Sequence, residues 1–308
     1  MAGDCTFTVM TATWNRAHTL PRLYNSLCQQ TLRGFEWVVV DDGSTDLTAD
    51  LMEQWRCNAF FRVQYHSQQH AGKHVAINRA VASARGEYFL ILDSDDWLFP
   101  DSLERYLAIW QSIPMSERCG FAGVAGRCMR ADGSLVGGPW DCDLIDATPV
   151  EIRARYSVTG DLAEMVRTTV MREFPLPVFP GETFLSEGAL WFPMAKRYRL
   201  RYVNEPLYCV EYQSDGLSAN ARNLILNNPR GAFVNSCEWL ASGEPMSVGG
   251  AILSHIRLTR YGWLAGLSTV DVSRATPSRA WWVATLPLAA VSYLRDWLRL
   301  TRVKKSSK

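Results

Sequence analysis

Strong charge of either sign and paired cysteines are both missing from this sequence. The chain of 308 residues has a formal net charge of +1, so its composition gives no global electrostatic reason to expect nucleic-acid binding. None of the eight cysteines is spaced as CxxC or accompanied by histidine at zinc-finger spacing, which argues against a cysteine-based zinc site. We therefore expect free, mostly buried thiols in a reducing compartment.

Long apolar segments are missing as well. The first residues, MAGDCTFTVMTATWNR, contain no basic stretch followed by a long apolar run, so they do not resemble a secretory signal and we expect a cytosolic protein. The uncharged run at 280–294 has 15 residues, and a helix of that length spans about 22 Å, less than the roughly 30 Å of a bilayer core. Pro287 interrupts this run, so we do not expect it to cross a membrane.

What the N-terminal third does contain is a regular alternation of strand-like and helix-like segments. Strands are expected at 6–11, 36–40, 60–66 and 87–92, and helices at 20–30, 47–56, 73–84 and about 100–112. This alternation is typical of right-handed βαβ units. The predicted fold class is therefore α/β, a Rossmann-like, mainly parallel sheet flanked by helices.

The remaining two thirds of the chain are less regular. Here we expect strands at 121–130 and 208–212, helices at 148–155, 161–173 and 185–198, and a polar loop at 213–221. From about residue 223 onward the pattern is helical, which predicts a helical C-terminal appendage.

A cluster of carboxylates directly follows the strand expected at 87–92. Asp93, Asp95 and Asp96 lie within four residues, and their mutual repulsion is costly unless a cation lies among them. Hard oxygen ligands suit Mg²⁺ or Mn²⁺, which usually also bind phosphates. Alternate residues of an extended chain point the same way, so we expect Asp93 and Asp95 to address one ligand together, with Asp93 reaching the ribose and Asp95 the metal. A solvated loop that caps the next helix is the alternative.

Two more of the expected strands end in polar residues. Asp41 and Asp42 form a second acidic turn, where a carboxylate can accept a hydrogen bond from a base N–H, although an ordinary aspartate-rich turn is the alternative. Thr11, Asn15 and Arg16 follow the first strand, and Arg16 is a candidate contact for a diphosphate. Ligands of parallel sheets bind at the carboxyl ends of the strands, so we expect these three ends to converge on one rim.

The segment HAGKHVAIN adds candidate phosphate ligands after the third strand. Lys73 is expected near a helix N-terminus, where a cation and amide donors both favour phosphate, and Asn78 follows about one turn later. A surface lysine is the alternative for Lys73. His70 and His74 are four residues apart, but no third nitrogen or sulfur ligand accompanies them, which disfavours a histidine metal site.

The blocks VMTATWNR, EWVVVDDGSTD and GKHVAINRAVASARGEYFLILDSDDW resemble family 2 glycosyltransferases of the GT-A fold. The resemblance is close over about residues 5–112, and PGETFLSEGALWFPMAKRY with RYVNEPLYCVEYQSDGLSAN extends it to about residue 220. It implies a catalytic domain at 1–220, divided into a nucleotide-sugar-binding half at 1–112 and an acceptor-side half at 113–220, followed by the helical region at 221–308.

The same resemblance implies an activity and its residues. A single sugar would pass, with inversion and with a divalent metal, from a nucleoside-diphosphate sugar to an acceptor hydroxyl, and UDP is the usual nucleotide in the family. The family's general base lies at the start of a helix, which matches Glu187, with Glu182 as second candidate; Gly188 stands where many relatives have Asp. The implied site comprises Glu187 as catalytic base, Asp95 as ligand of Mn²⁺ or Mg²⁺, and for the nucleotide sugar Thr11, Thr13, Asn15, Arg16, Asp41, Asp42, Lys73, Asn78, Asp93 and Ser94.

The C-terminal run has two interpretations. Its two tryptophans and apolar stripe precede a basic tail, Arg295, Arg299, Arg302, Lys304, Lys305 and Lys308. One interpretation is a helix lying in the interface of the anionic cytoplasmic leaflet, which would suit a lipid-linked or other glycan acceptor in cell-envelope or exopolysaccharide assembly. The other is a helix packed on the catalytic domain or in a homo-oligomer interface.

Two competing functions are disfavoured by what is missing, and a third remains. A processive polysaccharide synthase needs several spanning helices and usually a QxxRW element, and the chain has neither. A nucleotidyltransferase would begin with a glycine-rich phosphate loop where this chain has TATWNR. A non-catalytic nucleotide-sugar-binding or membrane-associated module is the remaining alternative, although both acidic turns and Glu187 are retained.

Overall fold

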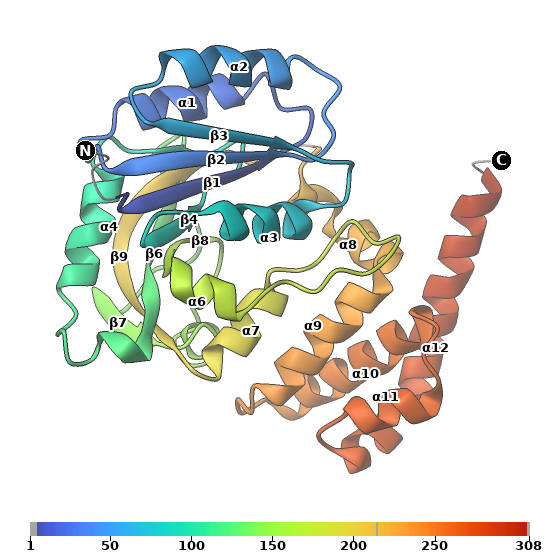
Figure 1. Ribbon diagram of the computed structural model, residues 1–308. Helices are drawn as coiled ribbons and strands as arrows, with labels where there is room; N and C mark the ends of the chain where they lie inside the picture. The colour runs from blue at the N-terminus through green and yellow to red at the C-terminus, as the bar shows by residue number, and fades with distance from the viewer. Residues whose placement is uncertain (1–4, 214, 307–308) are drawn as a thin grey trace. The chain divides into compact units, whose positions relative to one another are not determined.

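The computed structural model describes residues 5–213 and 215–306, and its contacts divide the chain into two compact units (Figure 1). The α/β unit comprises Met1–Leu176 and Met194–Ser214, and the helical unit comprises Pro177–Pro193 and Asp215–Lys308. The segment 177–193 therefore belongs to the helical unit, although the chain on both sides of it belongs to the α/β unit.

Within the described residues, the α/β unit contains a nine-stranded sheet in the order β3-β2-β1-β4-β8-β6-β9-β5, with β7 paired to β9. The strands are β1 (Phe7–Thr13), β2 (Phe35–Asp41), β3 (Arg62–Ser67), β4 (Tyr88–Ile91), β5 (Trp97–Leu98), β6 (Phe121–Arg130), β7 (Leu144–Ala147), β8 (Leu162–Arg167) and β9 (Arg199–Val210). The helices are α1 (Leu20–Cys28), α2 (Thr48–Asn58), α3 (Lys73–Ser83), α4 (Ser102–Gln111), α5 (Glu151–Ala154) and α6 (Thr168–Glu173), with a 3-10 turn at Arg118–Gly120. The α/β fold class is confirmed.

The first four strands form the parallel part of the sheet. Every residue of β2 and all but one of β1 are buried, as expected for parallel strands covered on both faces. Thr13 pairs with Asp41 and Met10 with Ile91, so the carboxyl ends of β1, β2 and β4 lie at the same edge. The predicted convergence of these strand ends on one rim is confirmed.

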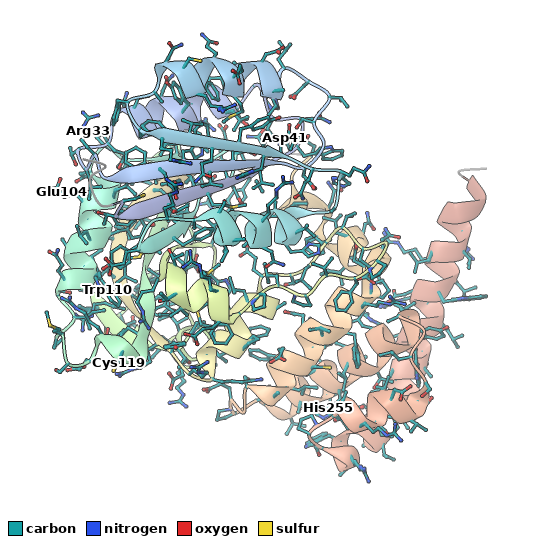
Figure 2. All side chains as sticks on the ribbon, in the orientation of Figure 1. Arg33, Asp41, Glu104, Trp110, Cys119 and His255 are labelled. Atoms are coloured by element: carbon teal, nitrogen blue, oxygen red, sulfur yellow. The ribbon has the colours of Figure 1, made fainter. Side chains whose placement is uncertain are left out.

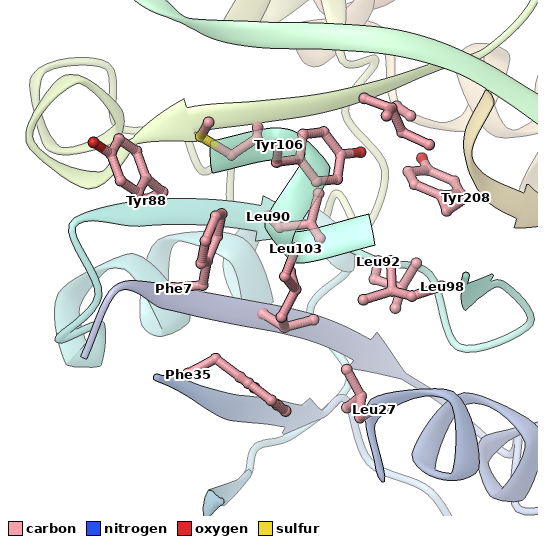
Figure 3. Packing of buried hydrophobic residues seen from close by; sticks show 14 of the residues in the cluster. Phe7, Leu27, Phe35, Tyr88, Leu90, Leu92, Leu98, Leu103, Tyr106 and Tyr208 are labelled. Carbon is pink, nitrogen blue, oxygen red and sulfur yellow. The ribbon is translucent and has the colours of Figure 1, made fainter. Parts of the chain in front are cut away.

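Large apolar side chains fill the core of the α/β unit. Phe7 and Leu90 from the sheet pack in one cluster with Leu103 and Tyr106 from α4 (Figure 3). All four are fully buried, and burying such a side chain contributes about 1.5–3 kcal/mol to the stability of the fold. This packing holds β1 and β4 rigidly, and with them the loops at their carboxyl ends.

The helix predicted at 161–173 is wrong in its first half. Residues Leu162–Arg167 form β8, which pairs antiparallel with β4 on one side and with β6 on the other, and only then does α6 begin. Met165 lies opposite both Leu90 and Val124. The residue types of this segment favour a helix, but hydrogen bonding to a strand on each side outweighs that local preference.

Several predicted boundaries and burials also need correction. The polar loop expected at 213–221 is shorter, because α8 begins at Leu217, and Ser214 lies outside the described residues. The helix expected at 148–155 is only the four residues of α5, and β9 starts nine residues before the strand predicted at 208–212. All eight cysteines are free as expected, but only Cys128 and Cys209 are buried, so most of the thiols are not.

The helical unit is built from α7 (Gly188–Ala195), α8 (Leu217–Asn227), α9 (Pro229–Ala241), α10 (Val248–Leu264), α11 (Thr269–Ala275) and α12 (Arg279–Ser306). Its buried core contains Leu240, Leu258, Val272 and Trp282. Serine side chains cap α10 and α11, since Ser247 accepts from the amide of Gly250 and Ser268 from that of Asp271. Across the described part of the chain, none of the helices has the length and apolar character needed to cross a bilayer.

Candidate active site

The loops that follow β1 and β2 are tied to each other at the carboxyl edge of the sheet. The amide of Asn15 donates to Oγ of Ser44 over 2.8 Å, and the amide of Thr45 donates back to Oδ1 of Asn15 over 2.8 Å. Asn15 adopts φ of 53°, a left-handed conformation that asparagine tolerates better than most residues. The two loops are therefore fixed together beside Asp41, which Figure 2 labels at this edge.

Asp41 is buried at the end of β2 with both carboxylate oxygens engaged. Oδ1 accepts from the Ser44 amide over 2.8 Å, and Oδ2 accepts from the Tyr65 hydroxyl over 2.6 Å. Burial, together with the hydrogen bond to Asp41, raises the pKa of Tyr65 well above its usual range, so this hydroxyl stays a donor. Each carboxylate oxygen keeps one further lone pair, which is what a base N–H would need.

Asp42 is buried beneath the turn that leads into α3. Oδ1 accepts from Nε2 of Gln68 and from the Ala71 amide, both over 2.8 Å, and Oδ2 accepts from the Gly72 amide over 2.8 Å. Nδ1 of His70 lies 2.9 Å from Oδ2. A carboxylate has about four lone-pair sites, so these contacts use all of them. Asp42 thus shapes the 68–72 turn, and a direct contact with the nucleoside stays a prediction.

Thr11 and Thr13 of β1 differ in what their hydroxyls contact. Oγ1 of Thr11 accepts from the indole N–H of Trp37 over 3.0 Å inside the core. Oγ1 of Thr13 is equally buried but has no hydrogen-bond partner among the described residues. Because a buried hydroxyl without a partner costs free energy, Thr13 is the better placed of the two to bind a ligand at the rim.

The loop after β4 carries the carboxylate cluster and is held from several sides. Nζ of Lys73 lies 2.7 Å from Oδ1 and 2.8 Å from Oδ2 of Asp93. The amide of Asp96 donates to the carbonyl of Asp93 over 3.0 Å, which closes a tight turn. Oδ1 of Asp96 accepts from the Glu211 amide over 3.2 Å. Lys73 and Asp93 are therefore brought together, as the sequence suggested for one shared site.

Arg22 of α1 binds the main chain of this loop. Its Nη2 donates to the main-chain carbonyl of Asp95 over 2.6 Å and to Oε2 of Glu211 over 2.7 Å. Its guanidinium carbon lies 3.9 Å from the centre of the Trp97 ring, a distance at which a cation and an aromatic face attract. Three contacts from one side chain thus fix the backbone at Asp95.

The electrostatics of the cluster fit a divalent cation. Burial and the charge of Asp93 raise the pKa of Asp95, although Arg16 and Lys73 oppose this. Burial and both neighbouring carboxylates raise the pKa of Asp96 to about 9. Among the described residues, no group of three or more His, Cys, Asp or Glu side chains could itself hold a metal ion. A single carboxylate of this cluster could still bind Mg²⁺ or Mn²⁺ if substrate phosphates and water complete the coordination.

The other predicted donor-site residues lie in different surroundings. Arg16 is close enough to lower the pKa of Asp95, and Ser94 is buried within the carboxylate loop. Asn78 instead pairs through both ends of its amide with the main chain of Leu176, over 2.7 and 2.9 Å. Asn78 therefore joins α3 to the end of α6, away from the contacts that connect the carboxylate loop.

The two candidate bases lie in the helical unit. Glu182 accepts from the amides of Arg230 and Gly231 over 2.8 and 2.9 Å, so its carboxylate caps the start of α9. Glu187 is exposed and directly precedes α7, and its carbonyl accepts from the amides of Leu190 and Trp191. Glu182 is therefore engaged as a helix cap, and the role of either carboxylate as a base stays a prediction.

Little room for a Cβ atom is left at Gly188, the residue after Glu187. A Cβ built on Gly188 would lie 2.3 Å from Oδ1 of Asn235 in α9 and 2.6 Å from the ring of Phe192. Both distances are shorter than real side-chain contacts, so any larger residue at position 188 requires the side chains of Asn235 and Phe192 to move.

Sequence patterns did not indicate three of the residues that shape the site. Arg22 and Glu211 are far apart in the chain, and nothing local connects them. Trp14 is 51% exposed and stacks on the His70 ring, with centres 4.7 Å apart. An exposed tryptophan directly after a strand is the one signal that could have been used.

Comparisons with known proteins show what the N-terminal part of the chain is similar to. Residues 8–119 match the family model described as Glycosyl transferase family 2. An uncharacterised glycosyltransferase of Nostoc sp. is 36% identical over 104 residues, which are 34% of this chain and 32% of that protein. A PGL/p-HBAD biosynthesis glycosyltransferase of Mycobacterium bovis is 38% identical over 103 residues, 33% of this chain and 40% of that protein. Each match thus spans well under half of the relative's own length.

Solved structures of similar fold extend over nearly the whole chain. TarS 1-349 of S. aureus superposes with a TM-score of 0.59 at 17% identity, covering 98% of this chain and 92% of that one. The mannosyltransferase PcManGT of Pyrobaculum calidifontis, solved with GDP-Man and Mn²⁺, superposes with a TM-score of 0.53 at 19% identity, covering 94% and 87%. At these identities the similarity establishes the fold, which is the GT-A type.

Proposed function

We propose, from the match of residues 8–119 to the model of glycosyl transferase family 2, that the protein transfers a single sugar from a nucleoside-diphosphate sugar to an acceptor hydroxyl. The observation that carries the proposal is the crowding of Asp93, Asp95 and Asp96 beside Lys73 and Arg16 at the carboxyl edge of the sheet. Charges of both signs in one place suit a ligand that is both a phosphate and a metal complex.

The donor would bind across the three strand ends. Asp95 would hold Mn²⁺ or Mg²⁺, and the ion when bound neutralises charge on the leaving diphosphate. Arg16 would supply a cation for the same phosphates, and Asp93, which contacts Lys73, would contact the ribose and the sugar. Asp41 and the unpartnered hydroxyl of Thr13 would contact the nucleoside. The solved relatives bind UDP, UDP-GlcNAc or GDP-Man, and we propose a UDP-sugar here.

Glu187 would act as the general base. Its carboxylate would take the proton of the acceptor hydroxyl as the oxygen attacks the sugar carbon from the face opposite the diphosphate, so the configuration inverts in a single displacement. Exposure of Glu187 at the start of α7 leaves room for a large acceptor. We propose a glycan or lipid-linked glycan as that acceptor, with transfer taking place in the cytoplasm at the membrane surface.

The proposal is tested by a donor screen with purified protein and Mn²⁺ or Mg²⁺. We expect slow release of nucleoside diphosphate from one donor among UDP-, GDP- and dTDP-sugars, with water as the acceptor. Asp95→Asn should abolish this release. Once an acceptor is found, Glu187→Gln should slow transfer by on the order of 100- to 10000-fold, and Glu53→Gln, a charge-matched change on exposed α2, should leave the rate unchanged.

Two negative results have different meanings. No release from any donor, together with no thermal shift on adding nucleotide and metal, would contradict the donor site itself. A nucleotide-induced thermal shift without transfer to any acceptor, and without an effect of Glu187→Gln, would favour a non-catalytic nucleotide-sugar-binding module instead.

A further inference from the structure

The last helix of the helical unit, α12, packs through one face only. Its buried residues include Trp282, Thr285, Ala289 and Asp296, which recur on one side of a helix with 3.6 residues per turn. Asp296 lies 3.3 Å from Nη1 of Arg260 in α10. This face is therefore fixed against α10, with Trp282 in the apolar core of the unit.

The opposite face of α12 is apolar and exposed. Val283, Leu288, Val291, Leu294 and Leu298 are between 48% and 67% exposed, and successive residues of a helix lie about 100° apart, so these five fall within less than half of its circumference. We call these five residues the outer face. Scattered exposed apolar residues are ordinary, but a continuous row along one helix marks a binding surface.

Charge and aromatic residues frame the outer face. Trp281 stands near its start and Trp297 near its end, both more than a third exposed. Arg295, Arg299 and Arg302 are exposed over the last turns that the structure describes in detail. The single acidic residue of α12, Asp296, is buried against Arg260. The exposed side of the helix is therefore apolar and cationic, with no carboxylate of its own.

We propose that the outer face of α12 docks on an anionic lipid surface, with the helix lying in the plane of the headgroups. A bilayer supplies both chemistries that this side of α12 needs, an apolar layer for the five aliphatic side chains and anionic headgroups for the arginines. Tryptophans at the two ends suit the headgroup level. A second copy of the chain offers the same helix with the same positive charge, so it provides apolar surface but no anion.

This docking is independent of the chemistry proposed at the strand ends, because it uses only residues of α12. The experiment is flotation of the full chain, without donor or metal, with phosphatidylcholine vesicles and with vesicles that also contain phosphatidylglycerol. Failure to float therefore says nothing about glycosyl transfer, and failure of transfer says nothing about docking. We expect binding only to the anionic vesicles, weakened by added salt.

Two pairs of substitutions locate the surface. Val291→Glu with Leu294→Glu should lower the vesicle affinity by about 100-fold. Arg299→Gln with Arg302→Gln should lower it by about 30-fold, the effect of two charges near an anionic surface. The matched control is Val248→Glu with Val270→Glu, two valines that are 66% and 57% exposed on α10 and α11, and we expect no loss from it.

The proposal is overturned if the full chain does not bind anionic vesicles, or if the control pair weakens binding as much as the outer-face pair. It is also overturned if sedimentation shows a dimer that the outer-face pair dissociates while vesicles bind neither protein, because the occupant would then be a second copy. Arg299 also donates to Oδ1 of Asn223 in α8 over 3.2 Å, so Arg302→Gln alone, at an exposed arginine, is the second variant, and its result stands even if the glutamate pair unfolds α12.

Discussion

The carboxylates at the strand ends are held in two different ways. Asp41 accepts from Ser44 and Tyr65 and keeps a lone pair on each oxygen, whereas the contacts of Asp42 occupy its carboxylate. Asp93 and Asp95 instead stand near each other and near cations, and burial together with the charge of Asp93 raises the pKa of Asp95. Asp42 therefore shapes the rim, Asp41 can still accept from a base N–H, and the second pair has charge that a metal and a donor would neutralise.

We predict that Arg22 positions Asp95, the proposed metal ligand, without itself contacting the metal. Arg22→Lys keeps the charge but cannot donate to both the Asp95 carbonyl and Glu211 while lying flat on Trp97. We expect the Mn²⁺ concentration needed for half-maximal nucleoside diphosphate release to rise on the order of tenfold, since residues that orient a ligand typically have that effect. The rate at saturating Mn²⁺ should stay close to that of the unchanged protein.

A metal titration separates this role from a general loss of stability. Arg56→Lys, which changes an exposed arginine paired with Glu53 in α2, is the control and should not alter the titration. If Arg22→Lys lowers the rate equally at all Mn²⁺ concentrations, Arg22 does not act through Asp95.

At the scale of elements, the sequence was informative where local pattern and long-range pairing agree. The strand predicted at 121–130 is β6, and the helix predicted at 73–84 differs from α3 by one residue at its end. β8 was missed because Leu, Ala, Glu and Met favour a helix locally, while its strand form depends on β4 and β6, which come from elsewhere in the chain. The convergence of the strand ends on one rim was predictable, since parallel strand order follows from βαβ alternation. The hydrogen-bond partners of Asp42 and Arg22 were not predictable, because they come from distant parts of the chain.

The pairing of β8 with β6 depends on a glycine. A Cβ on Gly123 would lie 1.9 Å from the carbonyl oxygen of Met165 in β8, and a backbone atom held in a central strand cannot move aside cheaply. We expect Gly123→Ala to lower the free energy of unfolding by about 3 kcal/mol, at the upper end of overpacking effects. Urea denaturation followed by circular dichroism measures this.

Gly120→Ala is the matched control, three residues earlier. A Cβ there would meet nothing within 4 Å, so we expect its unfolding midpoint to change little. Equal stability of the two variants would contradict the close approach of β6 to β8, and with it the sheet order that places β8 next to β6.

At the scale of the whole molecule, the segment 177–193, with the proposed base, belongs to the helical unit. It carries Glu187, and its contacts are with residues that come much later in the chain. Oδ1 of Asn228 accepts from the amides of Thr183 and Phe184 over 2.7 and 3.1 Å, and Glu182 caps α9. The boundary predicted at 220 separates these groups, while the contacts join them in one unit.

This organisation predicts that transfer and donor binding can be separated by a change in the helical unit. Asn228→Ala removes the acceptor of two amides and should loosen 177–193, which hydrogen exchange would report as faster exchange there. We expect transfer to fall on the order of tenfold or more, because a displaced base is costly, with the affinity for nucleotide and Mn²⁺ unchanged. Asn227→Ala, at an exposed neighbour that bonds only within α8, is the control. If Asn228→Ala weakens nucleotide binding as much as transfer, the donor site itself depends on the helical unit. The prediction that donor binding and transfer can be separated is then wrong.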